Sequence, residues 1–191
     1  MSMSFRCLYA GCCLLLSLCV AASDSSAIID ASGSSYQGNL MLNQAAGDAH
    51  QQVNARAIAP GAMPSIRVEQ QSDGVPAGYS SFSMQADITG SAFKGGSGVL
   101  GINQSAGAAN QQINSFRMGA GVRPESVDDS SLAQSAALSP ISSAAEPSET
   151  GDRRVNIDDQ AFTDSRGVVQ LNQAAGVGNR MVNNLGIRIL E

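Results

Sequence analysis

Asparagine and glutamine side chains recur at fixed positions in this chain, and their chemistry is hydrogen bonding rather than catalysis. Each primary amide has two N–H donors and one carbonyl acceptor, so amides stacked above one another can satisfy each other in a ladder. The recurring positions form a motif that occurs three times without a gap, beginning at Gly38, Gly98 and Gly167. Twelve of its residues form our candidate ladder: Asn43, Gln44, Gly47, Asn54, Asn103, Gln104, Gly107, Asn114, Asn172, Gln173, Gly176 and Asn183.

The residue types that usually carry catalysis or bind metals form no constellation in this sequence. His50 is the single histidine, which excludes histidine-dependent triads and histidine-clustered metal sites. The carboxylate pairs Asp128-Asp129 and Asp158-Asp159 lie outside the three motifs, where such pairs are ordinarily solvated. The segment 94–98 lacks the Gly-Lys-Ser/Thr order of a phosphate loop. We therefore expect no enzyme, and no catalytic, cofactor-binding or metal site.

Charge and cysteine usage narrow the class of protein further. The 191 residues include 11 Lys+Arg and 16 Asp+Glu, and this net charge of −5 argues against a nucleic-acid partner. All four cysteines occur in the first 22 residues, together with Arg6, an apolar run over 14–20 and the small residues that follow it. That arrangement is typical of an export signal, so we expect cleavage after Ala22 and a secreted mature chain without disulfides.

Each copy of the motif predicts a strand, a turn and a second strand. In the first copy Leu40 and Leu42 alternate with small or polar residues, as in a strand with one apolar face. The second and third copies repeat this alternation with Leu100, Ile102, Val169 and Leu171. Ala46-Gly47 and its equivalents predict the turn, because glycine reaches backbone angles that other residues avoid. A shorter strand is expected ahead of each copy, at 28–30, 82–88 and 155–158.

Composition separates three repeat modules from the segments that join them. The modules span 36–59, 93–118 and 162–190; the linkers are 60–92 and 119–161, and an N-terminal segment covers 23–35. The modules contain none of the six prolines and only two acidic residues, Asp48 and Asp164. Proline cannot donate to a β-ladder, so its exclusion fits strands. The proline-rich, acidic linkers predict long disordered segments, with a short helix over 132–138.

The modules can bury their apolar faces by stacking as rungs about 4.7–4.9 Å apart. Identical columns would then superpose, and the scarcity of acidic residues avoids like charges about 5 Å apart in a dry stack. We therefore predict an all-β fold in which three strand-turn-strand repeats stack as a β-solenoid or cross-β unit. Monomeric solenoids protect their terminal rungs with capping repeats. The sequence beside the first and third modules is too short for a cap, so we expect the edges to template polymerisation.

The motif resembles that of the Fap functional-amyloid fibre subunits, which are secreted biofilm amyloids of Gram-negative bacteria. The resemblance covers the three modules, where an apolar strand after a glycine leads into Asn-x-Ala-Ala-Gly and then Asn-Gln-Gln-x-Asn. It implies that the ladder residues form a fibre core, and that the partners are the chain itself and a major amyloid subunit. It also implies an outer-membrane export pore, a periplasmic chaperone, and a place in cell-surface fimbriae or extracellular matrix.

Two features set this chain apart within the resemblance. The family's major subunit typically ends in Cys-x-x-Cys, and this chain has no cysteine after Cys19, so it is most similar to the minor, nucleating subunit. His50 and Arg180-Met181 stand where the motif has Asn and Gln-Gln. The sequence leaves two alternatives open, a soluble periplasmic chaperone of fibre subunits and a non-polymerising solenoid adhesin.

Overall fold

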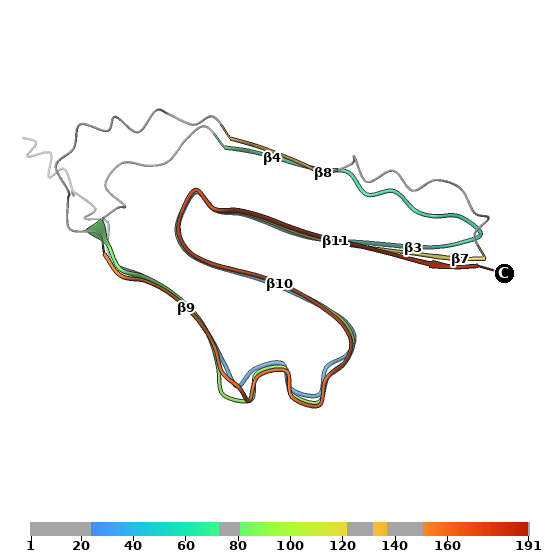
Figure 1. Ribbon diagram of the computed structural model, residues 1–191, viewed down its shortest axis with the longest axis horizontal. Coiled ribbons are helices and arrows are strands. Elements are labelled where there is room, and N and C mark those ends of the chain that lie inside the picture. The colour runs from blue at the N-terminus through green and yellow to red at the C-terminus, as the bar shows by residue number, and fades with distance from the viewer. Residues whose placement is uncertain (1–23, 73–80, 122–131, 137–150, 191) are drawn as a thin grey trace, which may run out of the picture.

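The computed structural model describes residues 24–72, 81–121, 132–136 and 151–190, and β-strand is the main secondary structure among them (Figure 1). The strands are β1 (Ser25–Asp30), β2 (Gln37–Asp48), β3 (Gln51–Pro60), β4 (Val68–Ser72), β5 (Met84–Thr89), β6 (Ser97–Ala108), β7 (Gln111–Ala120), β8 (Leu132–Ala136), β9 (Arg153–Ile157), β10 (Arg166–Val177) and β11 (Arg180–Ile189). The predicted all-β class is confirmed. Within the described ranges no helix is long and apolar enough to cross a membrane.

The chain follows the same path three times, and the three passes lie directly over one another. We call them rung 1 (24–72), rung 2 (81–121 with 132–136) and rung 3 (151–190). Equivalent strands pair in parallel in the orders β1-β5-β9, β10-β6-β2 and β11-β7-β3, so rung 2 lies in the middle. The pairing is in register across the motif, with Asn43 opposite Asn103 and Asn103 opposite Asn172. Figure 1 looks along this stack, where the three passes nearly coincide. The arrangement is compatible with a solenoid.

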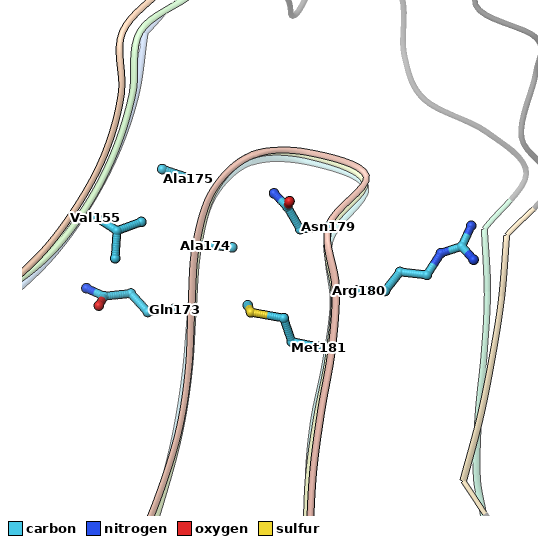
Figure 2. A pocket seen from close by; sticks show the side chains of 7 residues that line it. All are labelled: Val155, Gln173, Ala174, Ala175, Asn179, Arg180 and Met181. Atoms are coloured by element: carbon cyan, nitrogen blue, oxygen red, sulfur yellow. The ribbon is translucent and has the colours of Figure 1, made fainter.

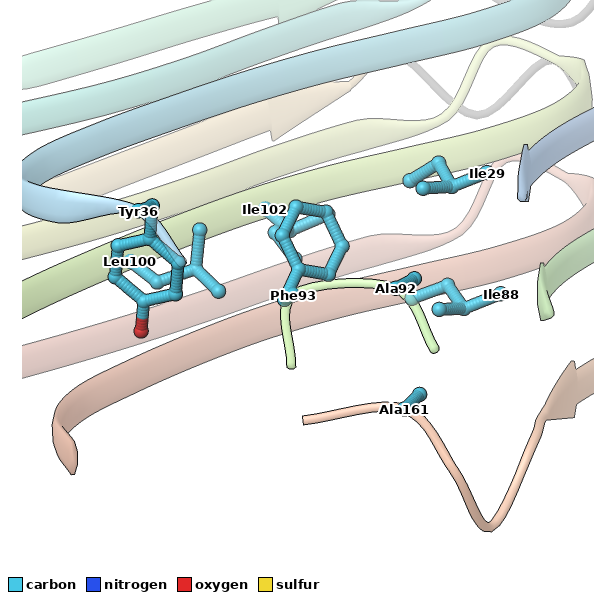
Figure 3. Packing of buried hydrophobic residues seen from close by; sticks show 8 residues of the cluster. All are labelled: Ile29, Tyr36, Ile88, Ala92, Phe93, Leu100, Ile102 and Ala161. Atoms are coloured by element: carbon cyan, nitrogen blue, oxygen red, sulfur yellow. The ribbon is translucent and has the colours of Figure 1, made fainter. Parts of the chain in front are cut away.

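The apolar core lies between the β1-β5-β9 sheet and the β2-β6-β10 sheet. Alternating apolar residues of both sheets point into this layer, and those of rung 2 are the most completely covered. Figure 3 shows the larger cluster: Ile29, Tyr36, Ile88, Ala92, Phe93, Leu100, Ile102 and Ala161. A second cluster near the end of β6 consists of small residues and a methionine: Ala27, Met84, Ala86, Ala106 and Ala108. A core of this size depends on stacking because each rung alone has few large apolar side chains.

At some equivalent positions, one rung has a large aromatic residue where the neighbouring rung has a glycine. The Phe93 ring occupies the space beside Gly33 in the rung below, and it stacks on Phe162 above with ring centroids 5.4 Å apart. The Tyr36 ring lies against Gly96, where an added Cβ would overlap it. Columns that are not identical are therefore filled by complementary volumes.

The turn between the two motif strands lies further along the chain than the sequence suggests. Gly47 is inside β2, and the chain reverses at Ala49 and His50. Ala49 has a φ of 56° and its equivalent Ala109 has a φ of 54°, while rung 3 has Gly178 at this position with a φ of 69°. The predicted turn at Ala46-Gly47 is wrong, because the turn uses the left-handed conformation two residues later.

The segments expected to be linkers contain four strands. The short strands expected ahead of each motif are confirmed as β1, β5 and β9, of which β5 and β9 lie in the linker ranges. Two more strands, β4 and β8, pair with each other in parallel. The helix predicted over 132–138 is wrong for residues 132–136, where a partner strand in the neighbouring rung overrides the local preference. The linker residues 73–80, 122–131 and 137–150 lie outside the described part.

Candidate fibre-assembly site

The first ladder column joins Asn43, Asn103 and Asn172. Asn103 Nδ2 donates to Asn43 Oδ1 over 2.9 Å, and Asn172 Nδ2 donates to Asn103 Oδ1 over 3.0 Å. The same amides reach the neighbouring sheet, because Asn103 Nδ2 also lies 2.9 Å from Val53 O. Each amide thus connects two rungs and two sheets.

The glutamine column faces the opposite sheet. Gln104 Nε2 lies 2.9 Å from Gln44 Oε1, and Gln173 Nε2 lies 2.8 Å from Gln104 Oε1. The three Nε2 groups also donate to backbone carbonyls of the β1-β5-β9 sheet, at 2.8 Å to Ile28 O, 3.0 Å to Ala27 O and 2.9 Å to Ala86 O. These bonds attach the short strands β1 and β5 to the motif strands β2, β6 and β10.

The third column runs through Asn54, Asn114 and Asn183. Asn114 Nδ2 donates to Asn54 Oδ1 and Asn183 Nδ2 donates to Asn114 Oδ1, both over 3.0 Å. Within each rung the third-column asparagine also donates to the first-column asparagine on the other motif strand. In rung 2, for example, Asn114 Nδ2 donates to Asn103 Oδ1 over 3.0 Å. The first and third columns therefore form one network across the two motif strands.

The motif glycines let the backbones of neighbouring rungs approach closely. Gly47 has a φ of 108°, and a Cβ added there would collide with the carbonyl oxygen of Gly107. A Cβ on Gly107 would collide in turn with the carbonyl oxygen of Gly176. The ladder therefore needs glycine in this column for two reasons, since a side chain is strained at this φ and has no space.

Burial differs sharply between the middle rung and the outer two. Asn103 and Gln104 have no exposed area, and Asn114 is 2% exposed. In rung 1, β2 alternates between exposed and half-buried residues, and β10 in rung 3 alternates between buried and half-buried ones. A buried amide is costly unless it is hydrogen-bonded, so the bonds that Asn103, Gln104 and Asn114 make are what permit their burial.

Further amides contribute that the sequence analysis left out of the candidate ladder. Gln111 Nε2 donates to Gln51 Oε1 over 3.1 Å, and Gln52 Nε2 donates to Gln112 Oε1 over 2.8 Å. Asn179 Nδ2 donates to Asn110 Oδ1 over 2.9 Å. Each of these columns is identical in two copies and differs in the other, so a search for columns shared by two of the three copies would have found them.

His50 replaces an asparagine and keeps a similar role. Its Nε2 lies 3.1 Å from Ala46 O and its Nδ1 lies 3.2 Å from Ser105 Oγ in rung 2. Burial lowers the pKa of the His50 ring, and hydrogen bonds to the backbone and the nearby Asp48 oppose that shift. The neutral imidazole is therefore the form that the stack favours.

Asp158, one of the carboxylates that could have suggested catalysis or metal binding, instead accepts hydrogen bonds from the backbone. Asp158 accepts hydrogen bonds from the backbone N–H of Gly90 at 3.3 Å and of Gln160 at 2.8 Å, which fixes the loop after β9. No group of His, Cys, Asp or Glu side chains in the described ranges is arranged to hold a metal ion. What the arrangement can do is continue its own columns with another layer of the same kind.

Comparison with known proteins gives one family. The family model described as the functional amyloid protein FapB/FapC family matches residues 17–190, which include all three motifs. No solved structure matches the chain.

Proposed function

The chain belongs to the functional amyloid protein FapB/FapC family, and we propose that within that family it is the minor subunit, which nucleates the fibre. Members of the family are structural subunits of functional amyloid fibres and not enzymes, so this chain self-assembles into an extracellular amyloid fibre. The finer proposal is that it is secreted through the periplasm and an outer-membrane pore with the help of a chaperone. It then starts fibres of a major subunit that support biofilm formation and surface adhesion.

The observation that carries the nucleating role is the buried middle rung. A single chain supplies three layers in register, and the amides of rung 2 are already bonded on both sides. Separate chains would lose translational freedom to form the same three layers. Linking the rungs covalently replaces that loss with loop closure, whose cost rises by only about 0.6 kcal/mol for each doubling of loop length. One folded chain is thus a complete template.

The two alternatives predict different behaviour. A soluble periplasmic chaperone or a non-polymerising adhesin would have the same stack, but its outer rungs would not bind further copies and it would form no fibres. Thioflavin fluorescence and sedimentation of the signal-free protein separate them from a fibre subunit. The half-exposed strands of rungs 1 and 3 favour the fibre subunit, because open parallel edges bind further strands.

Seeding tests the nucleating role directly. Pre-assembled wild-type protein is added in trace amounts to the major subunit, and the lag before thioflavin fluorescence rises is measured. We expect the lag to shorten several-fold. A matched seed in which residues 172–176 are scrambled should lose most of this effect, because it removes both the Asn and Gln ladder positions and Gly176. An equal effect from the scrambled seed, or no effect from the wild type, would contradict the nucleating role.

A further inference from the structure

The two outer faces of the stack differ in shape. The outer face of rung 3 carries a pocket of about 250 Å³, lined among others by Val155, Gln173, Asn179 and Met181 (Figure 2). Figure 2 shows Gln173 and Val155 on one side of β10, and Asn179 and Met181 around the turn into β11. The two departures from the repeat motif lie on opposite outer rungs, with His50 on rung 1 and Arg180-Met181 on rung 3.

The hydrogen bonds of the ladders give these faces opposite polarity. In all three ladder columns, the amide of each later rung donates to the amide of the earlier one. Gln173 Oε1 on rung 3 is therefore left buried without a partner among the described residues. At the other end, Gln44 Nε2 donates to Ile28 O in its own rung and not to an amide of another rung. The three columns thus leave an unpaired acceptor on rung 3, although the bond from Gln52 to Gln112 runs in the opposite direction.

The glycine columns impose the same order on the backbones. In the Gly47 column the Cβ positions of Gly47 and Gly107 point to the next rung, and the atoms nearest to that of Gly176 belong to the side chains of Asn179 and Arg153. In the column that begins at Gly38 the direction is reversed, since a Cβ on Gly98 would collide with Gly38 O while one on Gly38 meets nothing. Both columns continue without a break only when rung 3 of one copy meets rung 1 of another. A two-fold axis joining like faces would instead reverse the strand direction.

Charge complements this order. Arg153 is exposed and lies beside the outer side of Gly176, with its Cδ 3.5 Å from the Cβ position. Because Gly47 of an incoming copy would oppose Gly176, the exposed Asp48 that follows it would come beside Arg153. Rung 1 has four acidic residues and two arginines, whereas rung 3 has five arginines and four acidic residues.

We propose that the pocketed face of rung 3 is the docking site for rung 1 of a second copy of this chain. Residues 46–52 of the incoming copy cover the pocket, Gln44 donates to Gln173 Oε1, and Asp48 pairs with Arg153. The contact is head to tail, and a heterologous contact that does not close on itself generates a filament. The inference rests on the proposed function, since it names the partner surface by which the subunit assembles.

Charge reversal with complementation tests the docking. Asp48→Arg alone would oppose Arg153 with an arginine, and Arg153→Asp alone would oppose Asp48 with a carboxylate. Each variant alone should elongate roughly threefold to tenfold more slowly than wild type in thioflavin assays at low salt. An equimolar mixture should approach the wild-type rate, because alternating copies place an arginine opposite an aspartate at every junction.

A matched mixture excludes an effect of net charge. Lys94→Asp changes the charge by the same amount as Arg153→Asp, but it lies on the exposed surface of rung 2. Mixing Lys94→Asp with Asp48→Arg should give no gain over Lys94→Asp alone, because the Asp48→Arg chain still presents an arginine to every Arg153 that it meets. Docking is overturned if this mixture is rescued equally, or if the first mixture grows no faster than its faster component. A wild-type chain that forms no fibres would overturn the proposed function as well, so the two failures are distinguishable.

Discussion

One buried amide in the middle rung serves three acceptors. Gln104 Nε2 lies 2.9 Å from Gln44 Oε1, 3.0 Å from Ala27 O and 2.9 Å from Asp87 O. Its side chain therefore joins two rungs and two sheets. The consequence is that a change of a few atoms at this position disturbs several elements at once.

Gln104→Glu should prevent or greatly slow assembly. The substitution keeps the shape but removes the N–H donors of all three bonds, and it buries a carboxylate without a cation, at a cost of roughly 3–5 kcal/mol. Gln160→Glu makes the same chemical change at an exposed position outside the ladders. Thioflavin kinetics at equal concentration should show a near wild-type lag for Gln160→Glu. Equal slowing by both variants would mean that net charge governs assembly.

His50 should make the stack less stable as the pH falls. Burial lowers the pKa of this ring, so between its folded pKa and the ordinary value of about 6.5 the unfolded chain binds more protons than the folded one. Stability from this group is complete above about pH 6.5 and is lost as the pH falls toward the folded pKa. The denaturant midpoint of fibres should fall more between pH 7.5 and pH 5 for wild type than for His50→Asn. A parallel decrease in both proteins would assign the pH dependence to carboxylates.

Individual strands of the stack are selected by pairing across rungs more than by their own sequence. The apolar alternation, the identical columns and the lead-in strands could be predicted from the sequence, because each leaves a period or a repeat. The turn at Ala49 and Ala109 could not, since alanine rarely has a positive φ and is held there by the stack. Strand β8 was also missed, because its partner β4 lies in another rung. The packing of Tyr36 against Gly96 could not be predicted either, because neither segment alone shows that the two residues lie in contact.

Gly107→Ala should be more damaging than its size suggests. The added methyl group would collide with Gly176 O and with Met84 Sδ, and the φ of 115° is strained for alanine. We expect a loss of about 3 kcal/mol or more, which would separate rungs 2 and 3. Gly61→Ala is the control, since its φ of 74° is also positive but no atom lies within 4 Å of the added Cβ. That variant should lose only about 1–2 kcal/mol in guanidinium unfolding.

At the scale of the whole molecule, the described residues form a stack of three layers in which protection from solvent is unequal. Hydrogen exchange should therefore be slowest in β6 and β7 of the unassembled chain, and faster in β2 and β10. If copies dock as proposed, the outer strands become inner ones in fibres, and mass spectrometry should show that exchange in β2 and β10 slows to match β6. If β2 remains fast after assembly, rung 1 is not a contact surface between copies.

The open side of Gly38 makes it possible to build a chain terminator. A methyl group there meets nothing within one molecule, but it would occupy the place where another copy brings Gly167. A Gly38→Ala subunit could still attach through its rung 3 to a fibre end that presents rung 1. That end would then present the substituted rung 1 and could not add another subunit. One such molecule per fibre end is enough, so a small fraction mixed into wild-type protein should shorten fibres in proportion to dose. Fibre lengths measured by electron microscopy would then report how many copies a growing fibre end adds before the variant terminates it.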